Sequence, residues 1–355
     1  MVDWSLARQV ARLAAGGESA VAPGFDVAAC CAEMEPYVAG YTGLVLGSPS
    51  PAPEAVARAE WASVNLDSLA KMLDPVAARL DDRLGFAGPL AGPLRVGAAA
   101  AVAAEAGLVM GYISQRVLGQ YDVSLLGGEA PPRLLLVAPN LAKAIVDLDV
   151  DAEAFGRWIC AHELTHVFQF QGVPWLRGHL SGLLREYLAT VDVRIERGAA
   201  GGLPSLRDPA KLVEAYRAGG LAALVQTGEQ RALMARVQAV MAVIEGYSEH
   251  VMDAIAPSAI PSHEGLREAM SRRRASRSAP ERLIERLLGF DLKLRQYELG
   301  KRFCDAVVEA SGIARLNAVW AGPEALPTST ELDEPEAWLD RIARSGPKVL
   351  TEPSA

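Results

Sequence analysis

Hydrophobic residues recur at intervals of three and four along most of the chain, the spacing typical of helices that bury one face. Alanine, leucine, arginine and glutamate, which are good helix formers, dominate these stretches, and runs of β-branched residues are few. The pattern predicts a mainly helical protein. Helices are expected at residues 4–15, 53–80, 94–118, 152–171, 174–197, 208–218, 229–255 and 280–311.

One stretch has strand character instead. The segment RLLLVAPN, residues 133–140, is a short apolar run, and YDVSLLGG, residues 121–128, precedes it as a possible hairpin partner. A small sheet is therefore expected just before the helix at 152–171, and the fold class is mainly α with a small β-sheet (α+β). A bound substrate is expected alongside the strand at 133–140, as an added strand.

Composition bounds the domain organisation. With 355 residues, half of them hydrophobic, the chain can bury a substantial core. We expect a helical region at 1–118 packed on the core, a catalytic region at 119–322, and a loosely ordered, proline-rich tail at 323–355. Together these regions are expected to form one compact unit.

Charge and cysteine content limit the possible partners. The net charge of −8 disfavours nucleic acid or an anionic membrane as the main partner. The apolar stretch at 96–117 contains Glu105 and is rich in alanine, so it is interpreted as a buried core helix rather than a membrane span. The four cysteines form no CxxC pair and the N-terminus has no signal-peptide pattern, which favours a cytoplasmic protein. A basic run at 267–286 is expected to be a solvated loop.

The segment AHELTHVFQF, residues 161–170, contains the clearest chemical pattern. His162 and His166 are four residues apart, so on a helix they project from one face and can hold one metal ion. Glu163 lies one position round the helix, where a carboxylate can act as general base without being a ligand. Apolar residues upstream continue the face of the histidines, so both rings are expected to point inward. Two histidines and a glutamate at this spacing predict a site for one Zn²⁺.

A hydrolytic zinc site usually has a third protein ligand, and two glutamates compete for this role. Glu186 follows His166 by twenty positions, a spacing similar to that of thermolysin-type enzymes. Glu245 lies in a stretch that is apolar nearly all round, where an isolated buried carboxylate is costly. This cost favours Glu245, with Glu249 one turn further on orienting a histidine N–H.

Several segments together resemble the bacterial zincin-like metallopeptidase type 2 family. They are VDW at the N-terminus, LGQYDVSLL, LLLVAPN, WICAHELTHVFQFQGVPWLRGHL, IEGYSEHVMD and LKLRQYELGKRF. The resemblance spans roughly residues 2–320. It implies a zincin-like fold with the HExxH helix beside a short sheet, His162 and His166 as ligands, Glu163 as base and Glu245 as third ligand.

The expected function is that of a zinc hydrolase, most simply a peptidase or amidase, acting on a peptide or small amide. Tyr247, His250 and Tyr297 are candidate donors to a developing oxyanion, although each also fits a structural role. The alternative is a non-catalytic helical binding or scaffold protein with a structural or degenerate metal site. That alternative predicts closed coordination by four ligands, for example with both Glu186 and Glu245 on the metal. The sequence leaves the substrate, the native metal and the oligomeric state open.

Overall fold

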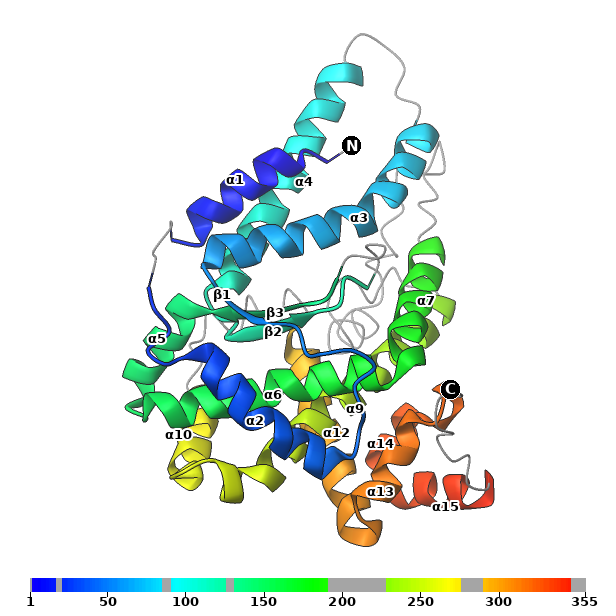
Figure 1. Cartoon of the computed structure of the whole chain (residues 1–355). Coiled ribbons are helices and arrows are strands. Elements are labelled where there is room, and N and C mark those ends of the chain that lie inside the picture. The colour runs from blue at the N-terminus through cyan, green and yellow to red at the C-terminus, as the bar shows by residue number, and fades with distance from the viewer. Residues whose placement is uncertain are drawn as a thin grey trace. The chain divides into compact units, whose positions relative to one another are not determined.

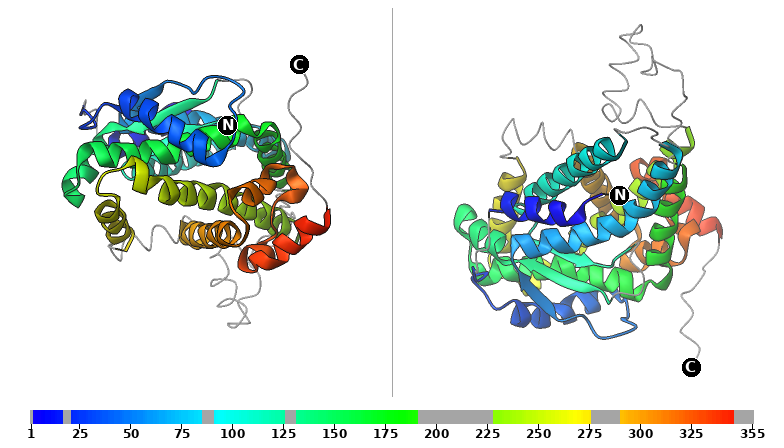
Figure 2. Two further views of the ribbon diagram at one scale, coloured as in Figure 1. Left: turned by 60° about the horizontal axis from the view of Figure 1, so that its bottom comes forward. Right: turned by 90° about the horizontal axis from the view of Figure 1, so that it is seen from above.

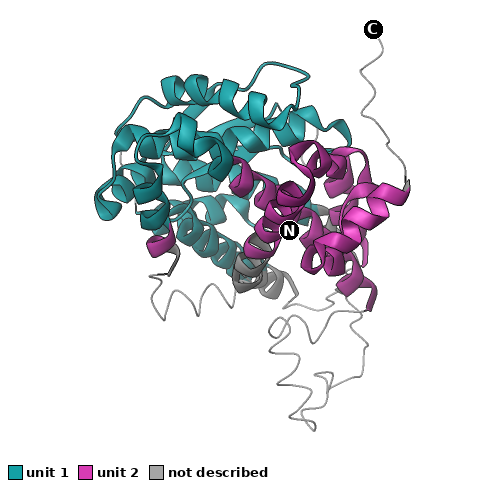
Figure 3. Cartoon of the chain, turned by 90° about the horizontal axis from the view of Figure 1, so that it is seen from below, with its two compact units in different colours: residues 1–177, 252–270 teal, residues 178–251, 271–355 magenta. Residues whose placement is uncertain are grey.

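The computed structural model of the chain describes residues 2–16, 21–84, 91–125, 131–190, 228–275 and 290–345. Its contacts divide the chain into two units (Figure 3). Unit 1 comprises residues 1–177 and 252–270, and unit 2 comprises residues 178–251 and 271–355. The sequence suggested three consecutive regions, whereas each unit combines two segments that are distant in the chain.

Unit 1 contains a three-stranded sheet in the order β1-β3-β2 (Figure 1). Strand β3 (Arg133–Val137) pairs parallel with β1 (Pro53–Val56) and antiparallel with β2 (Gly119–Asp122). The expected antiparallel pairing before the histidine helix is confirmed, but β2 begins two residues earlier than predicted, and only Tyr121 and Asp122 of the segment at 121–128 belong to it. The expectation of a substrate strand beside residues 133–140 is wrong, because β3 is the central strand and both of its edges are already paired.

Helices cover both faces of this sheet. On one side, Leu135 and Val137 of β3 share a buried cluster with α1 (Trp4–Ala14), α3 (Arg58–Leu84) and α4 (Ala91–Ser114). On the other side lies α6 (Ala152–Gly172), with α2 (Val27–Thr42) packed along it (Figure 2). The alternation of side chains along β2 fits this arrangement. Gln120 pairs with Asn65 of α3, whereas Tyr121 contacts Phe170 of α6.

The helix periods predicted most elements, with three kinds of correction. Residues 53–56 form β1 rather than the start of a helix, because the two prolines at 51 and 53 favour extended backbone and β3 supplies the hydrogen bonds. Two helices were not predicted: α2, capped by the Asp26 side chain, and α5 (Ala138–Leu148), which takes the last three residues of the expected strand. The third correction is the basic run, whose residues 267–275 belong to α10 (His263–Ala275).

Helix α4 is buried on one face only. Gly107 and Gly111 pack directly against α1, while Val96, Val102 and Leu108 are exposed. None of the described helices combines the length and apolar character that a membrane crossing requires. All four cysteines are buried and free.

Unit 2 contains most of α7 (Pro174–Thr190) and of α9 (Gly228–Ala259), together with α12 (Phe290–Ser311), α13 (Ile313–Leu316), two short 3-10 turns (Asn317–Trp320 and Pro323–Ala325), α14 (Ser329–Asp333) and α15 (Pro335–Ser345). Helices α9 and α12 approach so closely that a methyl group on Gly300 would overlap the backbone of Ala242, and one on Gly246 would overlap Gly300. The helix expected at 208–218, and the expected extensions at 191–197 and 280–289, lie outside the described residues.

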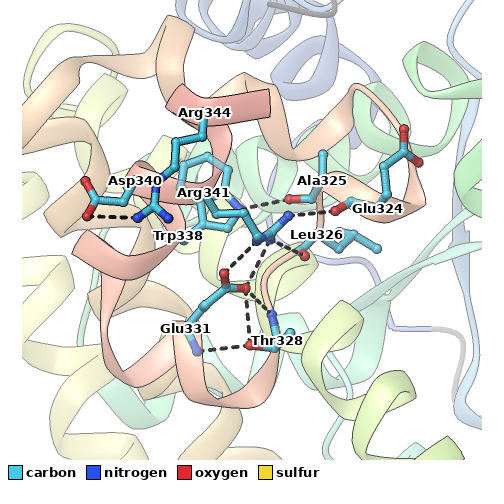
Figure 4. A network of polar contacts seen from close by, with 9 residues as sticks. All are labelled: Glu324, Ala325, Leu326, Thr328, Glu331, Trp338, Asp340, Arg341 and Arg344. Carbon is cyan, nitrogen blue, oxygen red and sulfur yellow. Dashed lines mark hydrogen bonds and ion pairs between the residues drawn. The ribbon is translucent and has the colours of Figure 1, made fainter. Parts of the chain in front are cut away.

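The expectation of a loosely ordered tail is wrong for residues 323–345. Arg341 of α15 donates to the Glu331 carboxylate of α14 and to the carbonyl oxygens of Glu324 and Leu326 (Figure 4). The fully buried Trp338 donates to the carbonyl of Ala325 at 2.8 Å and packs edge-on against Phe303 of α12. These long-range contacts, which local composition does not reveal, hold the segment in place.

Candidate metal centre

Helix α6 carries the HExxH residues in the interior of unit 1. It begins after Asp151, whose side chain accepts a hydrogen bond from the backbone N–H of Ala154. Most of its residues from Ala154 to Gln169 are buried. His166 and Glu163 are 9% and 5% exposed, and His162 is half-buried. The inward orientation expected for the motif is therefore confirmed.

The two imidazole rings face each other through their Nε2 atoms. Those atoms are 3.2 Å apart, and the rings are nearly perpendicular, at 89°. Two nitrogen ligands of one tetrahedral zinc ion, each about 2.05 Å from the metal, are separated by roughly 3.3 Å. The histidine pair thus already has the spacing that a shared ion requires.

Gln169 orients one of these rings. Its Oε1 lies 2.8 Å from His166 Nδ1, and Gln169 is fully buried. A side-chain carbonyl only accepts hydrogen bonds, so Nδ1 carries the proton and Nε2 keeps its lone pair towards His162. The sequence did not assign Gln169, although a polar residue between two phenylalanines, three positions after a ligand histidine, was an available signal.

Glu245, rather than Glu186, is the carboxylate that lies with the histidines. Possible ligand atoms of His162, His166 and Glu245 all lie within 4.8 Å of one another. Glu245 is half-buried on α9, less enclosed than the sequence suggested. The Glu186 side chain is 62% exposed and 4.0 Å from Arg236. Among the described residues, no further histidine, cysteine, aspartate or glutamate joins this cluster.

Glu163 packs against the sheet. A methyl group placed on Gly119, the first residue of β2, would lie 2.6 Å from Glu163 Oε1 and 2.8 Å from its Cγ and Cδ. The carboxylate of the predicted base therefore occupies the side-chain position of residue 119. The sequence did not reveal this contact, since glycine in a strand also marks bulges and tight bends.

A buried thiol lies beside the motif but is a poor ligand. The Sγ atoms of Cys160 and Cys31 are 3.0 Å apart. The pKa of Cys160 is raised, first by this contact, then by burial, and also by the nearby negative charge of Glu163. A thiol with a raised pKa stays protonated, whereas metals bind the thiolate. The donor set is therefore the imidazoles and the carboxylate.

The remaining predicted site residues have local partners. Tyr247 is fully buried and its hydroxyl donates to Asn317 Oδ1 at 2.8 Å. His250 Nδ1 lies 2.7 Å from Asp305, which also accepts from Lys301. These contacts provide structural roles, and a role of either residue at an oxyanion stays a prediction. Glu249 is half-buried and its predicted orienting role is untested; Tyr297 lies in α12, but its side chain is outside the described part of the chain.

Comparison with known proteins agrees with this geometry. Residues 2–339 match the model of the zincin-like metallopeptidases. The chain belongs to this family. As a zincin-like metallopeptidase it is expected to hold a metal, typically zinc, and the residues that fit one are His162, His166 and Glu245.

A solved structure extends the comparison over nearly the whole molecule. This zincin-like metallopeptidase is similar to a protein from Chloroflexus aurantiacus, described as "a putative hydrolase with a novel fold". The two are 31% identical, with a TM-score of 0.72, over 98% of this chain and 100% of the other. No curated protein matches the chain. The family match and the structural similarity both support a hydrolase. The family match confirms the family that the sequence motifs suggested.

Proposed function

We propose that the protein is a zinc-dependent hydrolase that cleaves peptide bonds, with His162, His166 and Glu245 holding the metal and Glu163 as general base. The observation that carries the proposal is the group of three ligand-type side chains around two facing Nε2 atoms. Two histidines and a glutamate form one of the donor sets of catalytic zinc, which leaves a coordination position open. A structural site uses four protein ligands. Glu186, the extra ligand of the scaffold alternative, is exposed and not in the group.

Each residue has a distinct task in this proposal. When bound, zinc acts as a Lewis acid that polarises a carbonyl and lowers the pKa of water to about 7. Glu163 accepts a proton from the attacking water on its carboxylate and delivers that proton to the departing amine. Burial suits this task, because a carboxylate shielded from solvent exchanges its proton with the reactants rather than with bulk water. Gln169 holds the His166 ring through Nδ1, so that Nε2 faces His162.

The edge of β2 supports a peptide as substrate. Leu118 accepts a hydrogen bond from the backbone N–H of Val137, so Leu118 and Val137 form a hydrogen-bonded pair, and Gly119 and Leu136 form the next, non-hydrogen-bonded pair. The N–H and C=O of Gly119 therefore point away from β3. Among the described strands, β2 pairs only with β3. An extended peptide can pair with this edge, next to the Glu163 carboxylate.

The proposal is tested by comparing Glu163→Gln with the wild type after zinc loading. Metal content is measured by elemental spectroscopy, and hydrolysis by mass spectrometry on a mixture of peptides of varied sequence. Glu163→Gln should keep its zinc and lose roughly 10²–10⁴-fold in kcat/KM, the usual contribution of a general base. Equal turnover by the variant and the wild type would rule out this mechanism.

A matched pair of glutamine variants tests the third ligand. Glu245→Gln should weaken zinc binding, whereas Glu186→Gln should bind zinc as the wild type does, because Glu186 is exposed. If Glu186→Gln weakened zinc binding and Glu245→Gln did not, Glu186 would be the third ligand instead. Tight zinc binding combined with no hydrolysis of any peptide would favour the structural-site alternative.

A further inference from the structure

Residue 119 has no room for a side chain. The methyl group of an alanine there would lie within 2.8 Å of three atoms of Glu163, closer than carbon atoms approach without a bond. Gly119 lies in a regular strand and its φ is not in the positive range that favours glycine. The lack of space for a side chain, rather than the backbone conformation, therefore explains why residue 119 is a glycine.

Strand β2 is fixed on both of its faces, so it cannot yield easily to a larger residue. Gln120 exchanges two side-chain hydrogen bonds with Asn65 on the α3 side. On the α6 side, the buried Tyr121 accepts a hydrogen bond from Gln171 and packs against Phe170. A methyl group at residue 119 therefore displaces the Glu163 side chain rather than the strand.

We infer that Gly119 is a positioning residue for the reaction: by leaving its side-chain position empty, it holds the Glu163 carboxylate against the β2 backbone. This inference rests on the proposed function, in which Glu163 is the base. The same residue directs its N–H and C=O to the open edge, where the substrate would pair. Gly119 thus sets the distance between the base and the backbone of a bound peptide.

The kinetic test combines Gly119→Ala with changes at Glu163. Gly119→Ala should keep the zinc content of the wild type and lower kcat at least tenfold, with KM changed less. Glu163→Asp is shorter by one methylene and gives back the space that the alanine takes. Gly119→Ala should therefore lower kcat by a smaller factor in the Glu163→Asp background than in the wild type. In the Glu163→Gln background it should not lower kcat any further. An equal loss in all three backgrounds would mean a general structural effect and would overturn the inference.

A second readout does not depend on activity or on metal. The melting temperature of the metal-free protein should fall in Gly119→Ala and recover in the double variant Gly119→Ala, Glu163→Asp. Gly178→Ala serves as control, since no atom lies within 4 Å of the added methyl group. It should melt at or slightly above the wild-type temperature, because alanine favours a helix more than glycine does. An unchanged melting temperature in Gly119→Ala would refute the contact. If no peptide is hydrolysed by the wild type, the proposed function fails, while the melting data still decide whether residue 119 and Glu163 compete for space.

Discussion

Replacing Gln169 with leucine isolates the contribution of a single hydrogen bond to the metal centre. Leucine has nearly the size of glutamine but no acceptor, so His166 Nδ1–H loses the partner that lies 2.8 Å away. A buried N–H left without a partner costs about 1–3 kcal/mol. The ring can avoid this cost by moving its proton to Nε2, which removes the lone pair that faces His162. Either response weakens metal binding.

The expected weakening is roughly 10- to 100-fold in zinc Kd, the usual effect of removing a group that orients a ligand histidine, or about 1.4–2.7 kcal/mol. Zinc titration against a chromophoric chelator at fixed pH measures it. Gln171→Leu is the matched control, because Gln171 lies on the same helix but contacts Tyr121 and Ser48 instead of a histidine. Wild-type affinity in Gln169→Leu, or an equal loss in Gln171→Leu, would refute the role of Gln169.

Two further predictions concern unit 2. Gly300→Ala should destabilise the protein by about 1–3 kcal/mol, because the methyl group overlaps the Ala242 backbone. Gly265→Ala has open space in a helix and should melt at or slightly above the wild-type temperature. Burial alone would raise the pKa of Glu331, but hydrogen bonds from Arg341 and Thr328 outweigh it and hold the pKa below its ordinary value of 4.5. This contribution to stability is complete above pH 4.5 and is lost as pH falls through the lowered pKa. In urea unfolding, the free energy of unfolding of Glu331→Gln should therefore be lower than that of the wild type at about pH 7, and the difference should be smaller in acid. An equal difference at both pH values would contradict this assignment.

The sequence predicted those parts of the molecule that depend on local spacing. Helix α6 follows from its apolar period, and the orientation of His162 and His166 follows from a separation of four residues on that helix. The cost of a carboxylate in an apolar helix favoured Glu245 over Glu186, although Glu245 is only half-buried. Physical arguments that concern one element at a time therefore sufficed to select the three candidate ligands that lie together.

The features that the sequence did not predict depend on partners distant in the chain. Residues 53–56 form a strand because β3, almost eighty residues later, pairs with them. The segment at 323–345 is ordered by Arg341 and by the burial of Trp338, not by its own composition. Gly119 faces Glu163 only because the sheet lies on α6. Such contacts require the tertiary arrangement and leave no periodic signal.

Closely packed glycines lie beside both carboxylates of the proposed reaction. Gly119 leaves room for Glu163, and Gly246, the residue after Glu245, lets α9 pack against Gly300 of α12. None of the three has a positive φ, so close packing is the reason that each lacks a side chain. A bulkier residue at position 119 would leave the HExxH residues intact while displacing the base. In the proposed reaction the motif supplies two ligands and the base, Glu245 supplies the third ligand, and Gly119 keeps the base in place.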